Sequence, residues 1–184
     1  MQNREETTQI PAATTQEIKI HNLLWEIDLE YRYQLARSSF IDFINKLLIV
    51  LIFMFSIIGL LGYYSKLTSF ISLLGSFILL IFEIDKTYLK HVELKNSLAI
   101  LLTKAESIFN ESFNESEYNK IKNEFDKIMS KMDEPYRILE ALCYNEMLLQ
   151  KRYEKNNFIT IPKWKIFFKH IFRFSSFGLC NKNK

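Results

Sequence analysis

The sequence has few of the residues that build metal centres, disulfide scaffolds and catalytic sites. Its 184 residues include only 2 cysteines and 3 histidines. The cysteines, Cys143 and Cys180, have neither CxxC nor metal-ligand spacing, so we expect free thiols and no bound metal. The histidines, His21, His91 and His170, lie in three separate segments, and we expect each to be a surface or interfacial side chain.

Recognisable catalytic motifs are also missing. The chain has no GxGxxG, P-loop, HExxH or GxSxG pattern, which are local signatures of nucleotide binding, metal-dependent proteolysis and serine hydrolysis. Residues 1–16 are polar and lack the apolar core of a signal peptide. We therefore expect a protein that is not an enzyme, uses no cofactor and begins with a mobile, uncleaved lead-in.

The sequence does have two long apolar runs, residues 47–64 and 67–84, separated by Ser65 and Lys66. A helix of about 18 residues rises roughly 27 Å, close to the hydrocarbon thickness of a bilayer. The alternative is a hairpin buried in a soluble core, but a chain of this length seldom hides two helices that are apolar all round. The sequence predicts an all-α membrane protein with a two-helix transmembrane hairpin and flanking cytosolic amphipathic helices.

Basic residues lie before the first apolar run and after the second, whereas the turn between the runs holds only Lys66. The flanking basic residues are Arg32, Arg37, Lys46, Lys86, Lys90 and Lys95. Because positive residues near the spans stay in the cytosol, we expect a multi-pass protein with both termini cytosolic. Tyr63 and Tyr64 would then anchor the hairpin tip at the outer interface.

Amphipathic helices are predicted on both sides of the hairpin, which gives about six helices in one domain and no strand. Residues 17–46 and 85–110 each carry apolar residues at three- and four-residue steps. The stripe residues are Ile20, Leu23, Leu24, Ile27, Tyr31 and Leu35 in the first segment, and Leu94, Leu98, Leu101, Leu102, Ala105 and Phe109 in the second. We expect the second of these helices to continue directly from the second span, so that a tilt in one moves the other.

Two further helices are predicted after residue 110. Ser116 is the expected N-cap of the first. The second begins at Pro135, with Asp133 or Glu134 as its cap, and runs to about Tyr153.

Small and polar residues within the apolar runs have two interpretations. Small residues let membrane helices approach closely, and the packing candidates are Ser56, Gly59, Gly62 and Gly75. A polar line at seven-residue steps would instead line a passage in a homo-oligomer, since two spans alone enclose no pore and a carboxylate ring favours cations. The line itself consists of Ser69, Ser76 and Glu83, and Ser72 lies alongside it as the fourth pore-lining candidate.

Residues 156–184 form a tail that is basic and aromatic, and contains no acid. Such a tail is typical of helices that contact the lipids of an anionic membrane interface. Burial against the helical unit is an alternative, and direct nucleic-acid binding is the least favoured because the aromatic face is continuous. The interface candidates in the tail are Trp164, Phe167, Phe168, Phe172, Lys163, Lys169 and Arg173.

The order of these features resembles the SLATT domain, the SMODS and SLOG-associating two-transmembrane effector domain of bacterial conflict systems. The likeness covers about residues 17–155 and is carried by WEIDLEYRYQLARSSF (25–40), the tight hairpin and DEPYRILEALCYNEML (133–148). It implies an antiviral effector of the bacterial inner membrane that forms a pore or disrupts the membrane, causing growth arrest or death of the infected cell.

The resemblance also implies the kind of trigger. Effectors of this family act with a separately encoded nucleotide synthase, nucleotide sensor or reverse transcriptase. The alternative from another class is a non-conducting membrane adaptor, or a regulatory subunit of a larger membrane complex.

Overall fold

A computed structural model describes residues 15–62, 65–81, 83–110 and 114–170. These residues form helices and no strand, which confirms the all-helical prediction for this part of the chain. The elements are α1 (Thr15–Leu60), α2 (Ser65–Ile81), α3 (Ile84–Asn110), α4 (Glu115–Met129), α5 (Arg137–Gln150), the short 3-10 helix η1 (Lys155–Asn157) and α6 (Lys163–Phe167).

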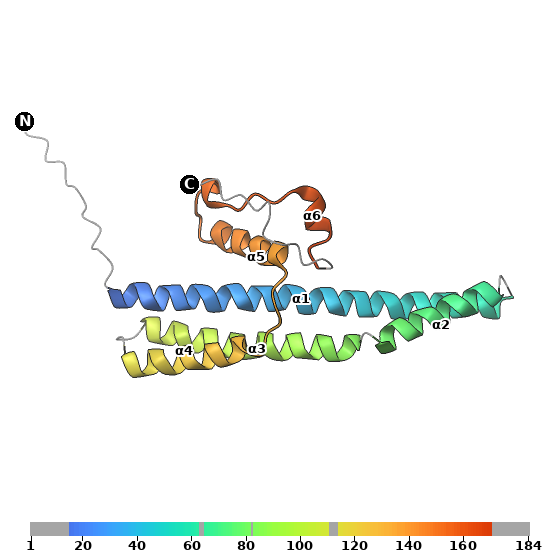
Figure 1. The fold of residues 1–184 in the computed structure, drawn as a ribbon, viewed down its shortest axis with the longest axis horizontal. Coiled ribbons are helices and arrows are strands. Elements are labelled where there is room, and N and C mark those ends of the chain that lie inside the picture. Colours follow the sequence, from blue (N-terminus) through green and yellow to red (C-terminus); the bar gives the residue numbers. More distant parts are fainter. Residues whose placement is uncertain (1–14, 63–64, 82, 111–113, 171–184) are drawn as a thin grey trace, which may run out of the picture.

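The longest element, α1, is one continuous helix of 46 residues (Figure 1). It joins the predicted amphipathic segment to the predicted first span. No proline occurs within it and its only glycine, Gly59, is next to its end, so nothing in the sequence forces a break between the two parts. At 1.5 Å per residue the helix is about 69 Å long, and it runs from the packed body into the hairpin.

The body of the molecule is built around the first half of α1. In Figure 1, α3 and α4 lie on one side of α1, and α5 and α6 lie on the other. The core shared by α1, α3 and α4 consists of Ile20, Leu23, Ile27, Leu98, Leu101, Ala105, Ile108, Ile121 and Phe125. A fully buried apolar side chain of this kind contributes roughly 1.5–3 kcal/mol, so these residues fix the two stripes against each other.

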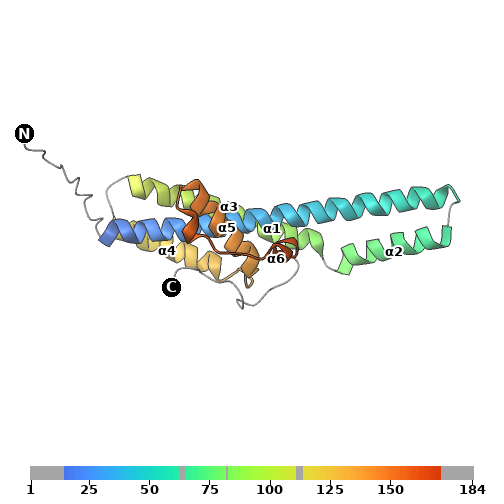
Figure 2. The same cartoon turned by 90° about the horizontal axis from the view of Figure 1, so that it is seen from above.

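The second half of α1 and α2 form an antiparallel hairpin that projects beyond the body (Figure 2). α1 ends at Leu60, whereas the first span was predicted to end at residue 64. Gly62 follows with φ of 82°. This left-handed conformation is one that glycine adopts without a steric penalty, so it ends the helix and starts the turn. Tyr63 and Tyr64, the predicted tip anchors, lie outside the described residues.

The predicted direct continuation of α2 into the following helix is wrong. α2 ends at Ile81 and α3 begins at Ile84, and Glu83 between them has φ of 40°. A positive φ is uncommon for a residue with a side chain and interrupts the helical path. The Glu83 carboxylate pairs with Lys86 Nζ at 2.6 Å on the far side of the break. Motion of α2 therefore reaches α3 through this link or through α1.

The predicted helix caps are also wrong. Asn114, and not Ser116, caps α4, because its side-chain oxygen accepts a 3.0 Å hydrogen bond from the Ser116 amide. α5 begins after Tyr136 and has no side-chain cap. The Tyr136 amide instead donates to Tyr33 Oη at 3.0 Å, so the segment before α5 is held against α1.

Candidate functional site: the apolar hairpin and its base

The hairpin presents large apolar side chains to its surroundings. None of the most apolar 18 residues of α1 is buried. The exposed apolar side chains are Leu47, Ile49, Val50, Leu51, Phe53, Met54, Ile57 and Leu60 on α1, and Leu67, Phe70, Leu73, Leu74 and Phe77 on α2. A soluble monomer rarely exposes a continuous apolar surface of this extent, which marks a membrane or protein contact.

Of the described helices, α1 alone is long and apolar enough to cross a bilayer. Its apolar part is exposed, unlike the core helix of a soluble protein, which is mostly buried. α2 is apolar but has only 17 residues, which rise about 26 Å against a hydrocarbon core of about 30 Å. The hairpin therefore has one arm of clear spanning length and one that is slightly short.

The two arms pack closely at two of the predicted small residues. A Cβ atom added at Gly59 would lie 2.8 Å from Thr68 Oγ1, and one added at Gly75 would lie 2.8 Å from Ile52 Cγ1. Real Cβ atoms essentially never come so close. Each glycine therefore leaves room for a side chain of the other arm, as expected where helix backbones approach in a membrane.

The serines of the polar line lie on two different surfaces of α2. Ser72 Oγ lies 3.3 Å from Ser56 Oγ of α1, so this pair joins the two arms. Ser69 and Ser76 are exposed, and Ser76 Oγ donates to the Ser72 carbonyl at 2.9 Å. Glu83 does not continue the line, because it lies in the break after α2. The outward part of the line is therefore Ser69 and Ser76.

A buried polar pair lies in the body, on the part of α1 about 20 Å before the start of the apolar run at Leu47. His91 Nδ1 donates to Gln34 Oε1 at 2.6 Å, and both residues are buried. Burial, with the nearby Arg37 charge, lowers the pKa of His91 to about 4, so the ring is neutral at pH 7. The prediction of a surface position for His91 was wrong. The ring is buried because it packs on the polar part of α1 that contains Gln34, which lies outside the predicted apolar stripe.

Arg37 is the centre of this base. It is buried, its Nη1 donates to the His170 carbonyl at 2.8 Å, and its guanidinium lies 4.2 Å from the centroid of the Tyr136 ring. It also lines a hollow of about 210 Å³ between α1, α3 and the segment before α5. The hollow is lined by Tyr33, Gln34, Arg37, Thr87, His91, Leu94, Asp133, Glu134 and Tyr136. The hairpin thus leaves the body at a polar junction of three segments.

Leu35, the last predicted stripe residue, faces outward and is 40% exposed. The buried face of α1 at this level is formed by Gln34, Arg37 and Ser38 instead. The signal that could have found the junction is these polar residues at three- and four-residue steps, in line with the apolar stripe before them.

Residues 155–170, which we call the strap, return from α5 to the base of the hairpin. Asn145 of α5 holds the near end, since its side chain exchanges two 2.8 Å hydrogen bonds with the backbone of Ile159. At the far end, the His170 ring stacks on Phe40 of α1, with centroids 4.1 Å apart. The predicted continuous aromatic helix is not formed within the described residues, because α6 has only five residues.

The predicted membrane-interface residues of the tail differ in their exposure. Trp164 and Phe167 are exposed, Lys163 is exposed, and Phe168 and Lys169 are half-buried. Phe172 and Arg173 lie outside the described residues.

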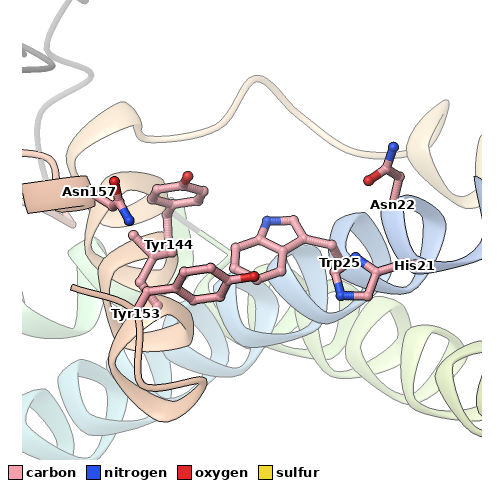
Figure 3. Close-up of a pocket in the computed structure, with 7 residues that line it drawn as sticks. His21, Asn22, Trp25, Tyr144, Tyr153 and Asn157 are labelled. Atoms are coloured by element: carbon pink, nitrogen blue, oxygen red, sulfur yellow. The ribbon is translucent and has the colours of Figure 1, made fainter. Parts of the chain in front are cut away.

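An open hollow of about 500 Å³ lies between α1 and the end of α5 (Figure 3). The Trp25 ring meets the rings of Tyr144 and Tyr153 edge to face, with centroids 5.8 and 6.2 Å apart. Lys151 Nζ lies 4.5 Å from the centroid of the Trp25 ring. These contacts dock α5 on α1, and the sequence did not predict them, because they join residues more than a hundred positions apart.

Other chemistry is sparse in the described part of the chain. It contains no group of three or more His, Cys, Asp or Glu side chains that could hold a metal ion. Cys143 is a buried free thiol whose pKa is raised to about 12 by burial, so it is not a reactive nucleophile at neutral pH. No family model, curated protein or solved structure matches the chain.

Proposed function

We propose that the chain is an integral membrane protein whose hairpin crosses the bilayer twice, with the helical body and both termini on the cytosolic side. The exposed apolar surface of the two arms carries this proposal, since lipid would cover it without any further protein. In water, each large apolar side chain left exposed would lack the roughly 1.5–3 kcal/mol of stabilising free energy that its full burial provides.

Charged groups lie at the base of both arms, which is where the proposed hairpin would leave the membrane and enter water. At the base, Lys46 pairs with Asp42 at 2.7 Å, and Asn45 of α1 donates to Asp85 of α3 at 2.8 Å. The Glu83–Lys86 pair lies in the link between α2 and α3. Between Lys46 and Glu83 the only charged residue is Lys66 near the tip, so no charge lies at mid-membrane.

The chain's role in this proposal is that of a membrane effector, as the resemblance to the SLATT domain implies. Several copies assemble and form a pore or disrupt the bacterial inner membrane when a separately encoded nucleotide synthase, nucleotide sensor or reverse transcriptase gives the signal. Ser69 and Ser76 support the pore form of this proposal, because their exposed hydroxyls would face a second copy or a water-filled passage.

A non-conducting adaptor or regulatory subunit is the second candidate, and one observation favours it. Gly59, Gly75, Ser56 and Ser72 make their contacts between the two arms of one chain. The hairpin is thus a well-packed anchor without any second copy, and the exposed cytosolic helices would then recruit a partner.

Membrane potential during induced expression separates the two functions. An effector depolarises the cells, alone or with its trigger, whereas an adaptor leaves the potential unchanged. In reconstituted planar bilayers, Ser76→Leu should alter the ion conductance of the effector while membrane insertion is retained. Ser107→Leu is the matched control, because Ser107 is an exposed serine of α3 with the same kind of intrahelical bond. Absence of conductance from wild-type protein with its trigger present would contradict the pore.

A further inference from the structure

We infer that the strap docks on the headgroup region of an anionic leaflet, with Trp164 and Phe167 as its lipid contacts and with Arg37 joining this contact to α1. The inference rests on the proposed membrane insertion of the hairpin. It adds a second, peripheral membrane contact at a defined place in the fold.

The strap lies at the level where α1 would enter the membrane. His170 contacts both Arg37 and Phe40, and Phe40 is roughly 10 Å along the helix from the start of the apolar run at Leu47. In Figure 1, α6 lies on the same side of α1 as α5 and closer to the hairpin than α5 does. The interfacial layer is the part of a bilayer that a helix at this level would meet.

The exposed side chains of α6 are of the interfacial type. Trp164 is 59% exposed and Phe167 is 80% exposed, the second highest value among the exposed large apolar side chains. Phe168, packed edge to face on Phe167 with centroids 5.0 Å apart, is half-buried instead. The strap therefore has an inner side, where Phe168 is half-buried and Lys165 is buried, and an outer side on which Trp164 and Phe167 are exposed. Tryptophan in particular favours the membrane–water interface, where its ring is partly apolar and partly wet.

The charge of the strap selects an anionic surface as the partner. Residues 155–170 include Lys155, Lys163, Lys165 and Lys169 and no acid. Of these lysines, Lys163 is exposed next to Trp164 and Lys169 is half-buried, whereas Lys165 is buried, with its Nζ 5.6 Å from the centroid of the Trp164 ring. Basic residues beside interfacial aromatics are attracted to the anionic lipids of the inner leaflet.

The two ends of the strap are tied to different helices. The Asn145–Ile159 hydrogen bonds fix one end to α5, and Arg37 and Phe40 fix the other end to α1. A displacement of α6 at the membrane surface therefore acts on α1 directly below the hairpin.

Tryptophan fluorescence tests this inference, because Trp25 and Trp164 are the only tryptophans. Trp25→Phe leaves Trp164 as the reporter, and Trp164→Phe leaves Trp25 as the matched control on the same helical body. Each full-length variant is reconstituted into vesicles of equal parts phosphatidylcholine and phosphatidylglycerol that carry a bromine quencher either near the headgroup or near the chain end. We expect the shallow quencher to reduce Trp164 emission at least about twofold more than Trp25 emission, and more than the deep quencher does. Vesicles of phosphatidylcholine alone should give weaker quenching.

The result that would overturn the inference is protein that floats with the vesicles while its Trp164 is quenched no more than Trp25. Protein that does not float at all would instead contradict the insertion of the hairpin. If Trp25→Phe does not fold, an environment-sensitive dye on Phe167→Cys in a Cys180→Ser background gives the same readout. Quenching of Trp164 by a DNA oligonucleotide, with none by anionic lipid, would also overturn the inference and make the strap a nucleic-acid surface.

Discussion

Arg37 Nη1 donates a 2.8 Å hydrogen bond to the carbonyl oxygen of His170, 133 residues further along the chain. The same guanidinium lies over the Tyr136 ring at 4.2 Å. These two contacts hold the segment before α5 and the end of the strap on α1. They do not offset the whole cost of burying the charge, because Arg37 Nε is buried without a hydrogen-bond partner among the described residues. The base of the hairpin is therefore organised by one cation.

Replacing this cation should loosen the strap. Arg37→Gln shortens the side chain and leaves the His170 carbonyl without its donor, so we expect a loss of about 1–3 kcal/mol in the free energy of unfolding. Urea unfolding in detergent, followed by circular dichroism, measures the loss, and proteolysis should cut the strap first. Arg137→Gln is the control, because the exposed Arg137–Glu140 pair is worth roughly 0–1 kcal/mol. Equal losses in the two variants would contradict the role of Arg37.

His91 should make the protein sensitive to acid. Its pKa falls from 6.5 to about 4 on folding because the ring is buried, so the neutral ring is favoured in the folded state. The stabilisation is complete above about pH 6.5 and is lost as the pH falls toward 4, by roughly 2–3 kcal/mol in total. His91→Asn should show a smaller loss than wild type between these pH values in urea unfolding. His21→Asn, at an exposed position, should keep the wild-type loss, and an unchanged His91→Asn profile would count against the prediction.

Glu30 should make the folded state less stable as the pH rises, which is opposite to the effect of His91. Burial first, and then the nearby Glu140 charge, raises its pKa from 4.5 to about 7. The carboxylate therefore destabilises the folded state as the pH rises from about 4.5 through 7. Glu30→Gln should raise the free energy of unfolding by about 1–3 kcal/mol at alkaline pH and leave it unchanged near pH 4. Glu26→Gln, at an exposed position on the same helix, should give no gain. A gain at both pH values would show that the charge is not the cause.

Gly75 should be required for close packing of the hairpin. The methyl group of Gly75→Ala would meet Ile52, so we expect a loss of about 1–3 kcal/mol in thermal unfolding in detergent. Adding Ile52→Ala should recover part of this loss, since two residues in contact couple by about 0.5–3 kcal/mol. Ser69→Ala, on the exposed surface of α2, is the control. Strictly additive effects of Gly75→Ala and Ile52→Ala would argue that the arms do not meet as described.

Periodicity predicted the helices because burial is regular wherever an apolar stripe packs. Ile20, Leu23 and Ile27 of α1 and Leu98 and Leu101 of α3 are all buried. Periodicity failed where polar side chains take over the buried face. Gln34 and Arg37 are buried where His91 and His170 supply their hydrogen-bond partners. These partners are far away in the sequence, so no local pattern predicts the burial.

Helix ends were the other part that local patterns did not determine. Glu83 has φ of 40°, although its neighbours read as a continuous apolar run into a helix. The first arm was predicted to end after Tyr64, but Gly62 ends it by adopting a left-handed conformation. Local propensity gives the existence of a helix more reliably than its boundaries, because caps and links depend on tertiary contacts.

The position of Lys66 relative to the membrane tests the central claim most directly. In a Cys180→Ser background, Lys66→Cys and Glu154→Cys each provide one exposed cysteine, since Cys143 is buried. A membrane-impermeant maleimide should label Lys66→Cys in intact spheroplasts and should label Glu154→Cys only after the membrane is opened. Labelling of both from the same side, or recovery of the chain in the soluble fraction without detergent, would contradict a hairpin that crosses the membrane twice.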